Sequence, residues 1–286
     1  MKKEKEMKQI KGTGKFRKTS LNAFLEHSIG IIGAGNMGSA LIAGLIKKGN
    51  RNIYVADHDK TNLNRFNDYK SHVKTSTCNK ETAMNSEAII IAVKPQQVEE
   101  VLHNIKYVVD GKLVISIAAG TTLKYLQNHL EYDRIVRTMP FLGSRYGYGA
   151  TAYAAGKACT QHDKELVEYI FGNPGLAFEA REDQMEAVTA LASKIGWDAQ
   201  LNQTMSTELE KQGLSNEVIR KYIAAILRTQ AAMIEEGKSF PEIYSTVASK
   251  GGTTQAGHEY GTEKGFYELH KGMIDAAIRR CKELCK

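Results

Sequence analysis

Two patterns of hydrophobic and polar positions follow one another along the chain. Up to residue 156, short apolar runs rich in β-branched residues alternate with segments whose apolar residues recur every three or four positions. Strands are predicted at the start of segments 28–50, 52–60, 87–105 and 112–130, and within 133–140 and 149–156. Uninterrupted apolar strands between amphipathic helices are typical of a parallel sheet covered on both faces. We therefore predict an α/β fold with a doubly wound Rossmann domain over residues 29–162.

The remainder of the chain, residues 163–286, has a helical pattern. Long segments at 184–210, 215–236 and 265–285 place apolar residues at helical spacing and charged residues on the opposite faces. No convincing strand follows residue 181. We predict an all-helical second domain over residues 163–286.

The first predicted strand leads directly into a glycine motif. Gly33, Gly35 and Gly38 form the pattern GxGxxG between an apolar run and a helix. In that context the first glycine permits a tight turn, the second lets backbone approach a pyrophosphate, and the third lets helix and strand pack closely. Asn36 and Met37 would open the helix, whose N-terminal N–H groups attract phosphate. A dinucleotide site is the favoured interpretation, and a turn without ligand is the alternative.

The second predicted strand bears on which dinucleotide is bound. Asp57 follows Gly38 by about 20 residues, the separation at which an acid meets the ribose 2′-hydroxyl. Such a carboxylate accepts from the hydroxyls of NAD and repels the 2′-phosphate of NADP. Because His58 offers a partial cation beside it, either NAD or NADP remains possible, with NAD favoured.

Ligands of open parallel sheets bind outside the carboxyl ends of the strands. Those ends bring further residues to the predicted crevice, namely Val93, Lys94, Pro95, Ala119, Met139 and Pro140. Lys94 is either a solvated loop residue or a contact to phosphate or substrate.

Charge and composition exclude several other classes. Of the formal net charge of +7, the leader 1–28 carries +5, from eight Lys or Arg and three Glu. We expect a disordered leader and no nucleic-acid partner. No apolar run reaches the roughly 18 residues of a membrane span, and no secretory signal is recognisable, so we expect a cytoplasmic protein. The four cysteines lack metal-site spacing, and no metal is expected.

Several motifs together resemble one enzyme family. "IGIIGAGNMGSALIAGL", "IIIAVKPQ", "ISIAAG", "RIVRTMP" and "VASKGGTTQAG" are similar to those of pyrroline-5-carboxylate reductases, from Ile29 to about Leu284. The resemblance implies NAD(P)H-dependent reduction of 1-pyrroline-5-carboxylate, a cyclic imine carboxylate, to L-proline. It also implies a homodimer or larger homo-oligomer built through the C-terminal helices.

The resemblance also implies a substrate loop at Gly251, Gly252, Thr253 and Thr254. The small residues would let backbone N–H groups and hydroxyls reach the substrate carboxylate. Thr253 or Thr254 would donate to the imine nitrogen. His258, just beyond the loop, is a further candidate for contact with the site.

The sequence departs from the family in this half of the site. "ALASKIGWD" (190–198) places Lys194 where the family has a serine, Lys250 replaces a proline, and Phe141 replaces an asparagine. If both lysines point inward they clamp a carboxylate, and if they point outward they are solvated.

The substitutions leave other functions open. Lys194 could act as a general acid, which makes a hydroxyacid dehydrogenase one alternative. A reductase of a related imine and a non-catalytic NAD(P)-binding paralogue are the others.

Overall fold

The computed structural model describes residues 24–141, 148–172 and 175–285. The chain divides into two compact units. The first unit comprises the residues up to Thr189 and those from Cys281 onward, and the second unit comprises Ala190–Arg280. The chain therefore crosses between the units twice.

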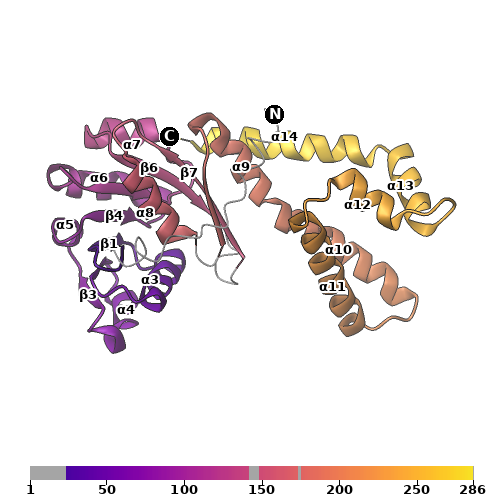
Figure 1. The fold of residues 1–286 in the computed structure, drawn as a ribbon, viewed down its shortest axis with the longest axis horizontal. Helices are drawn as coiled ribbons and strands as arrows, with labels where there is room; N and C mark the ends of the chain where they lie inside the picture. The colour runs from indigo at the N-terminus through magenta and orange to yellow at the C-terminus, as the bar shows by residue number, and fades with distance from the viewer. Residues whose placement is uncertain (1–23, 142–147, 173–174, 286) are drawn as a thin grey trace. The chain divides into compact units, whose positions relative to one another are not determined.

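The first unit contains one eight-stranded sheet in the order β3-β2-β1-β4-β5-β6-β7-β8 (Figure 1). The strands are β1 (Ile29–Ile32), β2 (Ile53–Ala56), β3 (Val73–Ser76), β4 (Ala88–Ile91), β5 (Leu113–Ser116), β6 (Ile135–Pro140), β7 (Gly149–Ala155) and β8 (Gly175–Glu179). Strands β1 to β6 are parallel, β7 runs antiparallel to β6, and β8 is parallel to β7. The order 3-2-1-4-5-6 is that of a doubly wound dinucleotide-binding sheet, which confirms the predicted α/β class.

Alternate residues of the strands enter two separate cores, one on each face of the sheet. On β4, Ile90 belongs to one cluster while Ile89 and Ile91 belong to the other, and all three are fully buried. Because both faces are covered, the strand has no solvent-facing positions. This explains why the sequence pattern showed an uninterrupted apolar run.

Helices and short 3₁₀ turns connect the strands. The helices of the first unit are α3 (Asn36–Lys48), α4 (Lys60–Asn64), α5 (Asn79–Met84), α6 (Val98–Ile105), α7 (Leu123–Leu130) and α8 (Gln161–Phe171). The 3₁₀ turns are η1 (Asn67–Tyr69), η2 (Pro95–Gln97), η3 (Lys106–Val108) and η5 (Glu182–Gln184). Residues of α3 and α8 pack in the first core, and those of α6 and α7 pack in the second.

The first unit extends beyond the expected domain boundary at residue 162. Helix α8 is held to it by the Tyr169 hydroxyl, which donates to Asn50 Oδ1 at 2.7 Å. Strand β8, which the sequence analysis did not predict, extends the sheet beside β7. An amphipathic helix pattern reveals a buried face but not the partner it packs against, so α8 could not be assigned to a domain from sequence.

The second unit is helical, as expected. Its helices are α10 (Lys194–Lys211), α11 (Asn216–Glu235), α12 (Phe240–Val247) and α13 (Thr253–Glu263), while α9 (Met185–Ala192) enters it and α14 (Phe266–Leu284) leaves it. Between residues 180 and 285 the structure contains no strand. Over the described ranges, no helix combines the length and apolar character that a membrane crossing requires.

The end of the expected leader belongs to the first unit. Phe24 is 1% exposed, and its ring centroid lies 5.3 Å from that of Tyr169 and 5.2 Å from that of His162. The leader prediction therefore does not hold for residues 24–28, whose aromatic anchor the charge count could not reveal. Residues 1–23 lie outside the described residues.

Candidate functional site

The glycine-rich loop follows β1 and requires its first glycine. Gly33 has φ +103°, and a Cβ there would lie 2.6 Å from the Ala92 carbonyl oxygen. Its N–H donates to the carbonyl of Ala56 at 2.8 Å, which ties the loop to the end of β2. A left-handed residue this close to neighbouring backbone has to be glycine.

The other two glycines have opposite surroundings. A Cβ on Gly38 would lie 2.0 Å from the Gly33 carbonyl oxygen, so α3 can approach the loop only without a side chain there. A Cβ on Gly35 would meet no described atom within 4 Å. Backbone at Gly35 is therefore open to a ligand, as the binding of a pyrophosphate requires.

The N-terminus of α3 suits an anion. Gly35 is its N-cap, no described side chain caps it, and its first turn from Asn36 contains no acidic residue. Asn36 is exposed and Met37 is half-buried. The N–H groups and dipole of this helix end favour phosphate, so the loop and helix fit a dinucleotide.

Asp57 follows β2 and is buried against the glycine-rich loop. Its Oδ2 accepts the Ala34 N–H at 2.7 Å and Asn62 Nδ2 at 3.3 Å, and its Oδ1 accepts the Asp59 N–H at 2.8 Å. His58 is exposed, and its Nδ1 lies 3.6 Å from Asp57 Oδ1. The predicted acid is at the expected strand end, but its carboxylate faces protein N–H groups.

The other predicted crevice residues lie at the carboxyl ends of neighbouring strands. In register, Ile32 of β1 pairs with Ile91 of β4, and Ile91 pairs with Ser116 of β5. Val93, Lys94 and Pro95 follow β4, Ala119 follows β5, and Met139 and Pro140 end β6. Lys94 and Ala119 are exposed, whereas Pro140 is buried. These residues therefore lie at the same end of the sheet as the glycine-rich loop, the end formed by the carboxyl termini of the parallel strands.

A buried arginine at this edge was not singled out by sequence reasoning. Arg137 of β6 is 5% exposed; its Nη1 lies 2.8 Å from Glu182 Oε1 and its Nη2 lies 3.2 Å from Glu186 Oε1. Glu182 Oε1 also accepts the N–H of Leu123 at 3.0 Å. Burial acts against the charge of Arg137, but the two carboxylates outweigh it and raise the arginine's pKa.

Within the first unit, this arginine cluster includes a residue of α9 and contacts the segment that follows α14. Glu186 lies in α9, which enters the second unit, and accepts a hydrogen bond from Cys285 Sγ at 3.4 Å. Burial and this carboxylate raise the pKa of the Cys285 thiol, which favours its neutral form. Arg137 lies within the predicted strand "RIVRTMP". The pattern of apolar residues in that strand does not indicate that the arginine would be buried and paired with carboxylates.

The predicted substrate loop is shorter than expected. Helix α13 begins at Thr253, so Thr253 and Thr254 lie in its first turn. Gly251 has φ +73°, and its N–H donates to Gln255 Oε1 at 2.8 Å. Gly252 is the N-cap, and no described side chain caps the helix. The two glycines turn the chain into a helix whose first N–H groups can face a carboxylate.

The remaining predicted residues of the second unit make local contacts. Lys194 forms an ion pair with Asp198 one turn along α10 and its side chain is 56% exposed. Lys250 is exposed. His258 Nδ1 lies 2.7 Å from the Tyr267 hydroxyl. The predicted cofactor residues thus lie in the first unit, and Lys194 with Gly251–Thr254 in the second.

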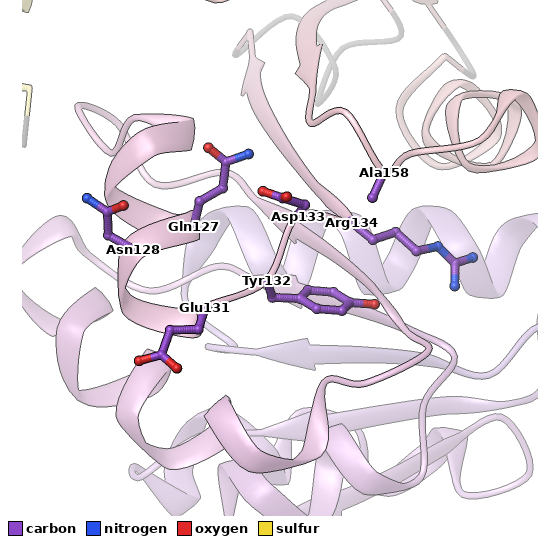
Figure 2. Close-up of a pocket in the computed structure, with 7 residues that line it drawn as sticks. All are labelled: Gln127, Asn128, Glu131, Tyr132, Asp133, Arg134 and Ala158. Carbon is purple, nitrogen blue, oxygen red and sulfur yellow. The ribbon is translucent and has the colours of Figure 1, made fainter.

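A surface pocket of about 730 Å³ lies elsewhere. Figure 2 shows it between the end of α7, with Gln127 and Asn128, and the segment before β6, with Asp133 and Arg134. This is the amino end of β6, opposite the strand ends that bear the glycine-rich loop. The Arg134 guanidinium already bonds Asp163 and the Gly111 carbonyl. The pocket is therefore separate from the predicted cofactor site.

Within residues 24–141, 148–172 and 175–285, no group of three or more His, Cys, Asp or Glu side chains could hold a metal ion.

Two family models match the sequence. The family described as "NADP oxidoreductase coenzyme F420-dependent" matches residues 28–120, and "Pyrroline-5-carboxylate reductase dimerisation" matches residues 182–284. The pyrroline-5-carboxylate reductase of Methanosarcina acetivorans is 34% identical over 265 residues, covering 90% of this chain and 98% of that protein. Pyrroline-5-carboxylate reductase 1 of Bacillus subtilis is 29% identical over 279 residues, covering 95% and 94%.

Solved structures agree with these relatives. A pyrroline-5-carboxylate reductase from Coxiella burnetii has a TM-score of 0.83 at 30% identity and covers 91% of this chain and 99% of its own. The Plasmodium falciparum pyrroline carboxylate reductase, solved with NADP bound, has a TM-score of 0.78 at 26% identity and covers 91% and 98%.

Proposed function

The chain belongs to the pyrroline-5-carboxylate reductase family, and we propose that it reduces 1-pyrroline-5-carboxylate to L-proline with NADH or NADPH. The observation that carries this proposal is the glycine-rich loop before α3. Its backbone is accessible to a ligand at Gly35, and Gly38 lets α3 pack against the loop. The match to the relatives extends over almost the whole chain. The enzyme is an NAD(P)H-dependent imine reductase that acts in proline biosynthesis.

The first unit binds and orients the cofactor. The pyrophosphate rests on the N-terminus of α3, at Gly35, Asn36 and Met37, where N–H groups and the helix dipole favour its charge. When bound, the reduced nicotinamide supplies the hydride that the imine carbon accepts. Val93, Lys94, Pro95 and Ala119 line the same strand ends and complete the cofactor site.

The second unit binds the substrate. The substrate carboxylate accepts hydrogen bonds from N–H groups of the first turn of α13 and from the hydroxyls of Thr253 and Thr254. One of these hydroxyls donates to the imine nitrogen. Gly251 and Gly252 keep this helix end free of bulky side chains. Met139 and Pro140, at the end of β6, are further proposed substrate-binding residues.

Lys194 gives this chain a cation where its relatives' motif has serine. In the free chain its ammonium pairs with Asp198. The substrate carboxylate replaces Asp198 as the partner of the Lys194 ammonium. It then accepts a charge-assisted hydrogen bond that a serine does not provide. Lys194 thereby offsets the departures of this chain from the family's polar loop.

The enzyme works as a homo-oligomer. Residues 182–284 match the family's dimerisation region, and exposed apolar side chains lie along α10, α11, α12 and α14. A homodimer joined through these helices buries them. The protein acts in the cytoplasm without a nucleic-acid partner.

A spectrophotometric assay tests the proposed function. Oxidation of NADH and of NADPH is followed with 1-pyrroline-5-carboxylate and, in parallel, with the six-membered cyclic imine acid. Turnover on the five-membered ring that clearly exceeds turnover on the six-membered ring is expected. Binding of cofactor without turnover on either imine would contradict the proposal and favour a non-catalytic paralogue. In a separate assay, reduction of NAD+ or NADP+ by a hydroxyacid would favour a dehydrogenase.

A further inference from the structure

Asp57 lies at the end of β2, the position from which an acid of a dinucleotide site meets the ribose. We propose that Asp57 is a positioning residue that braces the glycine-rich loop, and that it supports NADH and NADPH binding equally. The inference rests on the proposed function, because it concerns the cofactor site of that reaction.

Burial of the carboxylate is the first reason. The Asp57 side chain is only 6% exposed, whereas that of the adjacent His58 is 82% exposed. An acid that binds the ribose directly needs oxygens that a hydroxyl can approach in the free protein. Asp57 has little surface of this kind.

Hydrogen bonding is the second reason. A carboxylate has about four lone-pair positions, and three of those on Asp57 receive N–H groups of the protein. The donors are the backbone of Ala34 at 2.7 Å, the backbone of Asp59 at 2.8 Å and the Asn62 amide at 3.3 Å. Binding two ribose hydroxyls would require the carboxylate to give up some of these bonds.

The bond to Ala34 links the carboxylate to the ligand-binding backbone. Ala34 is fully buried and lies between Gly33, in the left-handed conformation, and Gly35, the residue open to ligand. Its carbonyl accepts the Ser39 hydroxyl at 2.7 Å. Together with the Gly33 N–H bond to Ala56, these contacts fix three successive peptide groups before α3.

Without the carboxylate, the buried Ala34 N–H would lose its acceptor, which is costly in a closed interior. The loop would then relax away from the shape that presents Gly35 and the start of α3. A dinucleotide of either kind places its pyrophosphate there. The loss would therefore fall on NADH and NADPH alike.

Asp59 provides a matched control. It is also an acid after β2, but it is exposed and caps α4, accepting the Thr61 N–H at 2.8 Å. Removing it deletes a carboxylate from the same segment without touching the loop.

The experiment measures dissociation constants of NADH and NADPH by titration calorimetry for the full chain and for Asp57→Ala, Asp57→Asn and Asp59→Ala. Asp57→Ala should weaken both cofactors by about tenfold, as expected for loss of a charged hydrogen-bond partner. Asp57→Asn, which keeps one acceptor oxygen, should weaken both by less. In both variants the ratio of the two constants should change by less than threefold, and Asp59→Ala should leave both constants unchanged.

Hydrogen exchange of the cofactor-free protein gives a second readout. Peptides spanning residues 33–38 should exchange faster in Asp57→Ala than in the unsubstituted chain and in Asp59→Ala. This change reports on the loop itself and needs neither cofactor nor activity. Thermal unfolding of each variant checks that the fold is intact, and Asp57→Asn serves if the alanine variant does not fold.

A weaker affinity for NADH together with a tighter affinity for NADPH, or any change in ratio of threefold or more, would overturn the bracing role and restore Asp57 as a ribose ligand. Unchanged exchange of residues 33–38 in Asp57→Ala would also overturn it. Failure of the unsubstituted chain to bind either dinucleotide would instead overturn the proposed function.

Discussion

Gly35 and Gly38 lie in the same turn, but a methyl group would have opposite effects at the two positions. At Gly38 it would meet the Gly33 carbonyl at 2.0 Å, and at Gly35 it would meet no described atom within 4 Å. Gly38→Ala should therefore lower the melting temperature by about 5–10 °C, since relief of the clash has to move backbone.

Gly35→Ala should leave the melting temperature of the cofactor-free protein nearly unchanged but weaken cofactor binding by about tenfold or more, because the methyl occupies the approach of the pyrophosphate. Thermal unfolding and cofactor titration measure the two effects. An equal loss of stability in both variants would contradict the assigned roles.

Lys194 can be tested by restoring the residue type of the family. Lys194→Ser should raise the KM for 1-pyrroline-5-carboxylate by roughly tenfold and leave the cofactor dissociation constants unchanged, because a charged hydrogen bond to the carboxylate is lost. Asp198→Asn, which frees the lysine from its partner, should not raise KM. If KM is the same in Lys194→Ser, this lysine is a solvated residue of α10.

The roles of single residues were predictable from sequence only where they depend on neighbouring residues in the chain. The three glycines have backbone roles that follow from their spacing and from the strand and helix around them. The hydrogen bond from Ala34 to Asp57 joins residues from two strand ends, and the pairing of Arg137 with Glu182 joins β6 to η5. Neither contact leaves a periodic signal in the sequence.

Helix α8 depends on a buried carboxylate at its N-terminus. Thr160 and Asp163 form a capping box, and Asp163 also accepts Arg134 Nε at 3.0 Å and Nη2 at 2.7 Å. Burial alone would raise the pKa of Asp163, but the bonds from Arg134 and the Thr160 N–H outweigh it and hold the pKa below the usual range of an aspartate.

A carboxyl group whose pKa is lowered by folding contributes stability above its unfolded pKa, and this contribution is lost as the pH falls through the folded value. Asp163→Asn should therefore cost about 2 kcal/mol near neutral pH. The difference in melting temperature from the unsubstituted chain should persist down to about pH 5 and shrink below about pH 4. A difference that does not change between pH 7 and pH 3 would contradict this account.

The elements themselves were largely predictable, with informative exceptions. Parallel strands of the first unit are buried on both faces, so their apolar runs are strong signals. The sequence analysis missed β8, whose residues "GLAFE" are mostly exposed at the sheet edge and form a short, weakly apolar run. The family resemblance implied a loop that included Thr253 and Thr254, whereas α13 begins directly after the glycine pair.

The second unit buries few of its side chains within one chain. Only Ala190, Ser206 and Ile219 are buried among its described residues 190–280, while large apolar side chains such as Tyr222 and Ile226 are more than half exposed. So much exposed apolar surface is typical of an interface, and the match of residues 182–284 to a dimerisation family supports the proposed homodimer.

Ile226→Glu should therefore shift the protein from dimer or larger assembly toward monomer in light scattering, because burying a lone carboxylate in an interface is unfavourable. Lys211→Glu, a charge reversal at the exposed end of α10, should leave the assembly intact. A dimer that persists in Ile226→Glu at micromolar concentration would place the interface elsewhere.

The two-unit organisation was predictable in kind but not in its boundary. The change from alternating strands and helices to helices alone is visible in the sequence. The last helix nevertheless returns to the first unit, where Cys285 bonds Glu186 and the carbonyl of Leu284 packs so closely that a Cβ on Gly120 would lie 2.5 Å from it. Periodicity describes each segment separately and cannot show that the end of α14 belongs to the first unit.

The proposed reduction can be followed through the hydrogen atom that passes from cofactor to product. The enzyme is incubated with 1-pyrroline-5-carboxylate and NADH or NADPH deuterated at the transferable position of the nicotinamide, and the products are analysed by mass spectrometry and NMR. The account predicts L-proline formed in equal amount to the cofactor oxidised, with one deuterium on the carbon that had been the imine carbon. Cofactor oxidation without labelled proline, or no oxidation by a protein that binds the cofactor, would contradict it.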